Sequence, residues 1–358
     1  MRTPPLLALT LFTPAAVLLF AAWLHISYPG QVVFRAKGDP SSATMVGALV
    51  VMVVIAFLVS RSPAFINKLT SMPPVTWLIF SVLLLKVESF APPRTDPTAL
   101  ITVSTALSPP VILSFFLFVA GFYAWFSARG AGRQPSRMLI TLVAVLLLLW
   151  GILAALKSSL LAGGVLLIAL CALRSSPYWW VVGAGVVGWS ATWMVGVTML
   201  SQSISGSMPF PPADYLSDSI FGQIDQIVAS ATLFGTGLTL PLSDSSGSFV
   251  LTHLLNQGGW LLAVVVMGLL MVFLITSLIV SLKATHPFAS VMALLLWAYL
   301  VLMTLASVLG NFGWLAFSGS IPLLSLNIPH GVFAAMLAGL SWYSINRQAT
   351  DSGAKNHL

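Results

Sequence analysis

The sequence predicts an all-α polytopic membrane protein, and two observations carry that prediction. Of the 358 residues, 58% are hydrophobic and 6% are charged, with a mean hydropathy of +1.00, whereas soluble domains carry about 25% charged residues. Apolar runs also recur along the chain, and they approach the length of about 20 residues that a helix needs to cross a bilayer. We therefore expect residues 1–358 to form a single membrane domain.

The apolar runs predict about ten transmembrane helices. The first follows Met1-Arg2 and is long for a signal peptide, with no convincing cleavage site after it, so it is expected to be retained. The sixth is short and begins with LLAGG, and it is expected to be a half-helix or to continue the fifth across a break. The predicted helices centre on residues 6–24, 43–60, 74–91, 108–127, 138–156, 160–174, 178–200, 259–283, 287–310 and 323–345.

The distribution of Lys and Arg predicts the orientation of these helices. With the N-terminus inside, ten basic residues fall on the cytoplasmic side and four on the outer side, and cytoplasmic loops normally carry the excess. Both termini are therefore expected in the cytoplasm. The net charge of +7 does not indicate nucleic-acid binding, because the basic residues are spread over short loops. The single cysteine, Cys171, is expected to pack in the core.

One long outer loop is expected at residues 201–258, between the seventh and eighth helices. It contains no Lys or Arg, and its middle reads SIFGQIDQIVASATLFGTGL. Loops of this length are usually functional or disordered. The apolar middle favours packing on the membrane face, as short interfacial helices.

Five stretches of the chain together resemble a known family. They are LSPPVILSFFLFVAGFYAWF (residues 107–126), LAALKSSLLAGGVLL (residues 153–167), IVASATLFGTGL (Ile227–Leu238), GSFVLTHLLNQGGWLL (Gly247–Leu262) and GWLAFSGSIPLLSL (Gly313–Leu326). In collinear order over most of the chain, they resemble motifs of the SEDS family of bacterial cell-wall glycosyltransferases (FtsW, RodA and SpoVE). That resemblance implies ten helices with one large outer loop, an inner-membrane location in bacteria, and a role in the peptidoglycan machinery that serves cell shape or division.

The chain departs from the family pattern at its ionisable positions. Neutral side chains replace the outer-loop aspartate thought to be catalytic, a glutamate pair, a second aspartate, and a glutamate and lysine. In that order these positions are Ser248, then Asn256 and Gln257, then Ser159, and finally Val111 and Ser114.

These departures bear directly on the chemistry of glycan polymerisation. That reaction needs a base for the attacking hydroxyl and positive charge at the leaving pyrophosphate, and a positioned base contributes about 10²–10⁴-fold. We therefore expect a non-catalytic scaffold or binding component. Two alternatives stay open: an active glycosyltransferase that uses Asp244 as a displaced base, and a flippase for a lipid-linked substrate.

The resemblance also indicates a substrate groove and partners. A lipid II-like undecaprenyl-linked sugar and a single-span partner such as a class B penicillin-binding protein are expected besides the lipid bilayer, with no cofactor and no metal. For His253 and His330 polar packing is favoured, although both could face one cavity, and His330 is expected at a helix break. The groove candidates are Gln223, Ser230, Gly235, Gly237, His253, Ser318, Gly319 and His330.

Overall fold

The fold is described from a computed structural model. It describes residues 4–27, 42–90, 107–129, 136–156, 160–173, 179–203, 220–236, 250–312, 321–325 and 328–355. Over these ranges the chain forms helices and turns, with one isolated bridge between Thr232 and Gly235. The helices are α1 (Pro4–Ser27), α2 (Ser42–Ser60), α3 (Pro63–Ser71), α4 (Pro74–Phe90), α5 (Pro109–Arg129), α6 (Arg137–Leu156), α7 (Leu160–Leu173), α8 (Trp179–Ser203), α9 (Ile220–Ser230), α10 (Val250–Lys283), α11 (Pro287–Asn311) and α12 (Ile328–Lys355).

The helices group into two compact units. Unit 1 comprises Met1–Arg61, Met208–Val280 and Leu300–Leu358, and unit 2 comprises Ser62–Ser207 and Ser281–Tyr299. The division passes through α10 and α11, so each of these helices contributes to both units.

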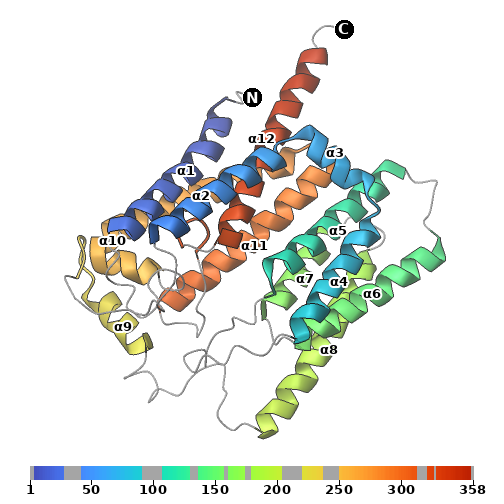
Figure 1. The fold of residues 1–358 in the computed structure, drawn as a ribbon, viewed down its shortest axis with the longest axis horizontal. Helices are drawn as coiled ribbons and strands as arrows, with labels where there is room; N and C mark the ends of the chain where they lie inside the picture. The colour runs from blue at the N-terminus through green and yellow to red at the C-terminus, as the bar shows by residue number, and fades with distance from the viewer. Residues whose placement is uncertain are drawn as a thin grey trace. The chain divides into compact units, whose positions relative to one another are not determined.

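In unit 1, α2 packs along α12 and α1 contacts both helices (Figure 1). Val46, Leu49 and Val53 of α2 form a buried cluster with Ala335 of α12. The backbones come close further along, because a Cβ atom on Gly339 would lie 2.8 Å from the carbonyl oxygen of Phe57. Small residues allow this kind of close helix packing in membranes, where van der Waals contact drives association.

In unit 2, the most extensive helix pairing is between α6 and α8. A Cβ atom on Gly151 of α6 would lie 2.2 Å from the carbonyl oxygen of Gly185 of α8. Gly163 of α7 faces Trp189 of α8 in the same way, at 2.3 Å from the indole ring. These contacts leave no room for a side chain, so glycine permits both helix approaches.

A buried hydrogen-bonded group joins α4, α5 and α6 in unit 2. The Ser81 hydroxyl donates to the carbonyl oxygen of Val111 at 3.0 Å and accepts from the indole N–H of Trp150 at 2.8 Å. The Trp150 ring stacks on Phe115, with centroids 4.3 Å apart and planes at 22°. One serine thus satisfies the only polar atom of a fully buried tryptophan.

The helix pattern refines the sequence prediction at several points. Each of the ten predicted segments contains a helix, but the described residues form twelve, because α3 and α9 are short and amphipathic rather than continuously apolar. α10 begins at Val250, before the predicted start at residue 259. The predicted break at His330 is wrong: α12 begins at Ile328, and Pro329 occupies its first turn, where proline is tolerated.

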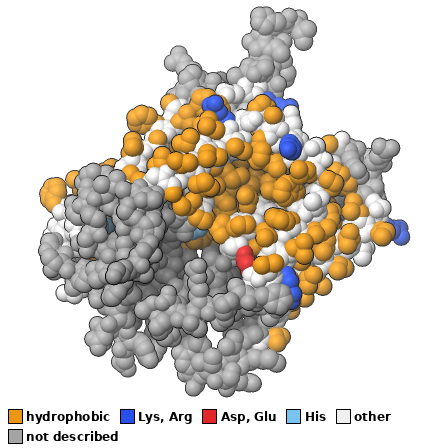
Figure 2. Space-filling model, in the orientation of Figure 1, with side chains coloured by type: hydrophobic (Ala, Val, Ile, Leu, Met, Phe, Trp, Pro, Cys, Tyr) orange, Lys and Arg blue, Asp and Glu red, His pale blue; other side chains and the backbone are white. Residues whose placement is uncertain are grey.

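The protein is a multi-pass membrane protein. Within the described ranges, four helices (α5, α6, α10 and α11) are long and apolar enough to cross a membrane, or five spans if α2 and α3 together form one bent span. Figure 2 shows hydrophobic side chains over most of the described surface that it draws. Cys171 is exposed on α7, so the prediction that it packs in the core is wrong.

Candidate functional site

Several candidate positions described in unit 1 lie at a break in α10. Gly259 has φ 69° and ψ −170°, which interrupts the helix. An interruption releases backbone N–H and C=O groups that must find other partners in a buried or membrane setting. Here the partners come from the turn that follows α9. We call this arrangement the α9–α10 joint; it comprises Thr232–Thr236 and Asn256–Leu261.

Three backbone hydrogen bonds hold the joint together. The N–H groups of Trp260 and Leu261 donate to the carbonyl oxygens of Thr232 and Leu233, at 3.0 and 3.2 Å. The carbonyl oxygen of Asn256, which an unbroken helix would pair with Trp260, accepts instead from the N–H of Thr236 at 3.0 Å. The turn therefore replaces helical hydrogen bonds that the break removes.

Two glycines make this approach possible. Gly235 has φ 113°, and a Cβ atom there would lie 2.9 Å from the carbonyl oxygen of Asn256. A Cβ atom on Gly259 would lie 2.4 Å from the backbone of Leu233. Positive φ and close backbone contact both favour glycine. The two glycines therefore allow the LFG and QGG stretches of the sequence to meet.

Asn256 adds a side-chain hydrogen bond to the joint. It is 3% exposed, and its Oδ1 atom accepts from the hydroxyl of Thr236. The neighbouring Gln257 is half-buried. Asn256 thus holds the loop turn to the helix with a neutral amide, at a position where the family resemblance implies an acid.

The C-terminal end of α11 holds the chain on both sides of the break. Asn311, fully buried, accepts through Oδ1 from the N–H of Thr252 at 3.0 Å, and its backbone carbonyl accepts from the Thr252 hydroxyl at 3.0 Å. The Thr252 N–H lies in the first turn of α10 and has no partner within its own helix. Beyond the break, the rings of Phe312 and Trp260 stack, with centroids 6.0 Å apart and planes at 13°.

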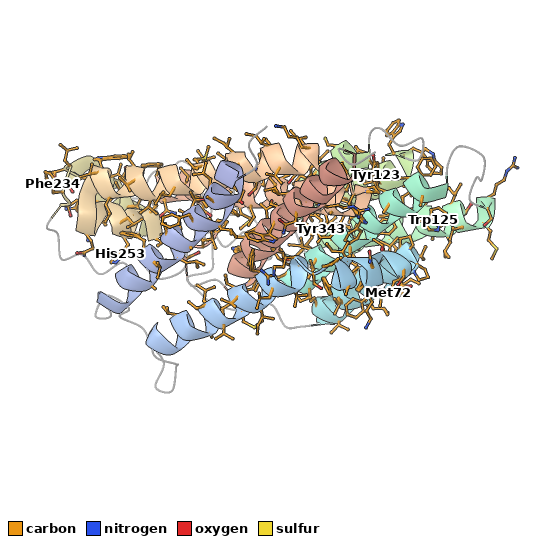
Figure 3. The ribbon with its side chains drawn as sticks, turned by 90° about the horizontal axis from the view of Figure 1, so that it is seen from above. Met72, Tyr123, Trp125, Phe234, His253 and Tyr343 are labelled. Atoms are coloured by element: carbon orange, nitrogen blue, oxygen red, sulfur yellow. The ribbon has the colours of Figure 1, made fainter. Side chains whose placement is uncertain are left out.

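The other groove candidates of unit 1 are dispersed around this joint. His253 is buried in the first turn of α10, and His330 is buried in the first turn of α12 (His253 is labelled in Figure 3). Ser230 is exposed at the end of α9, and its hydroxyl donates to the Gln226 carbonyl of the same helix at 2.6 Å. Gln223 belongs to α9. Of these candidates, Ser230 is exposed and both imidazoles are buried.

A strained turn precedes α12 in the third motif stretch. Leu323 has φ 67° and is buried, and the turn is closed by hydrogen bonds from Leu324 and Ser325 to the carbonyl oxygen of Ile321. A non-glycine residue in this conformation costs about 1–3 kcal/mol and persists where the surroundings fix it.

The predicted positions Val111 and Ser114 belong to unit 2 and are committed to internal contacts. Val111 is fully buried and its carbonyl oxygen accepts from Ser81. Ser114 is 3% exposed, and its hydroxyl donates to the carbonyl oxygen of Pro110 at 2.8 Å, within its own helix. Neither position presents a group that could act as an acid or base.

Glu88 of α4 fixes the start of α5, which the sequence did not indicate. Its carboxylate accepts from the hydroxyl of Ser108, the residue that precedes α5. Ser108 in turn accepts, through its carbonyl, from the N–H of Ile112 at 3.1 Å. The acid therefore takes part in a helix-start contact.

Six predicted site positions lie outside the described residues. They are Ser159, Gly237, Asp244, Ser248, Ser318 and Gly319. Among the residues that are described, no group of three or more His, Cys, Asp or Glu could hold a metal ion. Thr232 and Thr236 of the joint, and Thr252 beside it, take part in hydrogen bonds that sequence reasoning missed. The Gly258-Gly259 pair inside an apolar run was the available signal for the break.

Comparison with known proteins gives a fold relationship. No family model matches the chain, and no curated protein matches its sequence. A chain in a solved structure described as the structural coordination of polymerization and crosslinking by a peptidoglycan synthase complex is similar, with a TM-score of 0.59 and 16% sequence identity. The match covers 95% of this chain and 97% of that chain.

The similarity therefore extends over nearly the whole of both chains. It shows that this chain shares the fold of that chain, and the class of protein is an all-α membrane protein, as expected from the sequence.

Proposed function

We propose that this chain is a SEDS-like component of the bacterial inner-membrane machinery that builds peptidoglycan or a related envelope polymer, and that it acts as a non-catalytic scaffold or binding subunit. The fold match over 95% of the chain supports the envelope role. In this proposal the chain is a single membrane domain of about ten spans, with a periplasmic loop at residues 201–258 and both termini in the cytoplasm.

The observation that carries the non-catalytic role is the use made of Asn256. Its amide oxygen accepts a hydrogen bond from the Thr236 hydroxyl, and its backbone carbonyl accepts one from the Thr236 N–H. Val111 and Ser114 likewise serve internal contacts. At these three described positions, where the resemblance implies acid and lysine chemistry, the residues are thus engaged in contacts within the protein, and none of the three side chains supplies a base.

The proposed ligands follow from the same resemblance. A lipid II-like sugar would bind through neutral hydrogen bonds in a groove lined by Gln223, Ser230, Gly235 and His253, with His330 contributing from α12. A single-span protein, such as a class B penicillin-binding protein, would dock on the helices. Gly237, Ser318 and Gly319 complete the proposed groove.

The experiment is a polymerisation assay with purified protein in liposomes that contain lipid II. We expect no glycan from the natural chain and the same result from Asp244→Asn. Co-purification with a tagged class B penicillin-binding protein, before and after deletion of its membrane helix, tests the scaffold role. Glycan synthesis that Asp244→Asn abolishes would overturn the proposal in favour of a glycosyltransferase with Asp244 as its base.

A further inference from the structure

The turn after α9 exposes two large apolar side chains at its tip. Leu233 is 62% exposed and Phe234 is 77% exposed. Figure 3 shows Phe234 at the periphery of unit 1. The turn that carries them is held firmly, because Thr232 and Leu233 accept hydrogen bonds from α10. A fixed, exposed Leu-Phe pair is unfavourable in water and marks a surface with an apolar partner.

The body of α9 has a different environment. Ile224 and Ile227 are fully buried, while Asp225, Gln226 and Ser230 are exposed. The apolar side of α9 is therefore covered by protein rather than by lipid. The sequence predicted that the apolar middle of the loop packs on the membrane face; among the side chains of this segment that the structure describes, the large apolar ones that point outward are Leu233 and Phe234 of the terminal turn.

The change of burial along α10 identifies the partner of that turn. Every residue from Val250 to Asn256 is buried, whereas Leu261, Val264 and Val265 are 53%, 64% and 51% exposed. α10 is long and apolar enough to span a membrane, so the exposed side chains after Gly259 face hydrocarbon. The N–H of Leu261 donates to the carbonyl oxygen of Leu233, which places the turn at the beginning of this lipid-facing surface.

We propose that Leu233 and Phe234 insert into the acyl-chain region of the adjoining leaflet of the bilayer and anchor the α9–α10 joint at the membrane surface. The occupant is bilayer lipid, because the turn is continuous with the lipid-facing side of α10. The anchor sets the depth of Asn256 and Thr236, because Thr236 belongs to the same turn and donates hydrogen bonds to Asn256. It requires only that α10 spans the membrane, so it does not depend on whether the protein is an enzyme or a scaffold.

Spin labels at single cysteines test this proposal. The exposed Cys171 is first removed by Cys171→Ser, and nitroxides are attached in proteoliposomes to Phe234→Cys, to Leu261→Cys as the hydrocarbon reference, and to Asp225→Cys as the exposed polar reference on α9. Collision rates with oxygen and with a polar nickel complex are then compared. Equal melting temperatures of the labelled variants and the Cys171→Ser parent exclude unfolding, and Leu233→Cys provides a second probe of the turn.

We expect the oxygen-to-nickel ratio at position 234 to match that at position 261 and to exceed that at position 225 by about tenfold, because a polar complex is excluded from hydrocarbon. A ratio at 234 equal to that at 225 overturns the proposal, since the turn would then be in water. Protection of 234 and 233 from both reagents also overturns it, because protein and not lipid would then cover the turn.

Discussion

The α6–α8 crossing in unit 2 and the α9–α10 joint in unit 1 both bring backbones together through glycine, but they do so for different purposes. At the crossing, two helices keep their own hydrogen bonds, and Gly151 provides only room beside Gly185. At the joint, Gly259 breaks a helix and a separate segment supplies the missing partners. Packing alone stabilises the first contact, whereas backbone polarity determines the second.

The polar side chains of the two units also hold different kinds of structure together. In unit 2, Ser81 donates to Val111 and accepts from Trp150, all within a buried core. In unit 1, Asn256 and Asn311 hold irregular segments with amides, which have both donors and acceptors. The hydroxyl in unit 2 thus joins packed helices, whereas the amides in unit 1 hold a turn and a helix start to neighbouring segments.

The largest expected effect comes from overfilling the crossing with Gly151→Ala. The new Cβ would lie 2.2 Å from a backbone oxygen and 3.0 Å from the backbone nitrogen of Trp189. Because backbone cannot move aside as a flexible side chain can, α6 and α8 must separate, and we expect a loss of about 3 kcal/mol or more. Thermal or denaturant-induced unfolding in detergent measures this loss of stability.

The matched control is Gly183→Ala on α8. No atom lies within 4 Å of a Cβ placed there, and alanine is favoured over glycine in a helix by about 1 kcal/mol. The control should be neutral or slightly stabilising. Equal losses from both substitutions would show that the crossing does not depend on close backbone contact.

The second effect is at the joint, with Gly259→Ala. Its φ of 69° and its 2.4 Å approach to Leu233 make alanine strained in conformation as well as in space, and we expect a loss of about 2–3 kcal/mol. Amide hydrogen exchange should accelerate at Trp260 and Leu261, whose partners lie in the turn. Gly268→Ala, in open space on the same helix, should be neutral or slightly stabilising and should leave the exchange at Trp260 and Leu261 unchanged.

The helices show how far the sequence could predict the fold. Apolar runs located a helix at each of the ten predicted segments, because a membrane span needs a length and a hydrophobicity that are visible in the chain. The short helix α3 was missed because it follows an amphipathic pattern, in which Ile66 and Leu69 are buried, whereas α9 lies in the segment where short interfacial helices were expected.

The candidate site was less predictable than the fold. The motif resemblance drew attention to Asn256 and Gly235, which do meet at the joint. It did not indicate Thr236 or Thr252, because a hydroxyl that joins two distant segments leaves no periodic signal in the sequence. The break itself depends on a tertiary hydrogen-bond exchange between residues 232–236 and 256–261, which local propensity does not contain.

A smaller effect is expected from Asn311→Ala, which removes the acceptor of the Thr252 N–H. The amide also donates to the Ser307 carbonyl at 2.7 Å, so two buried backbone groups lose a partner. We expect a loss of about 1–2 kcal/mol. Asn67→Ala, at an exposed position of α3, should stay within about 0.5 kcal/mol of the natural chain, and an equal loss at both positions would contradict the role assigned to Asn311.

The smallest effect is the coupling between Thr236 and Asn256, and a double-mutant cycle of Thr236→Val with Asn256→Ala measures it. Hydrogen bonds between helices in membranes average about 0.6 kcal/mol in such cycles, and we expect a coupling of that size. Ser230→Ala combined with Asn256→Ala should show none, because the Ser230 hydroxyl bonds within α9. Additive losses in the Thr236 cycle would show that this hydrogen bond contributes nothing to the joint.

The same pair of residues tests function when Thr236→Val is measured in an Asn256→Asp background. The aspartate retains an acceptor for the Thr236 hydroxyl, so Thr236→Val should cost about as much there as it does beside the natural asparagine. Burial of an ionisable group at a position that is 3% exposed lowers overall stability. An equal cost in the two backgrounds would mean that the joint can accommodate an acid, and the neutral side chain would then reflect what the protein does rather than what its fold requires. A Thr236→Val substitution that costs nothing beside the aspartate would give the opposite conclusion.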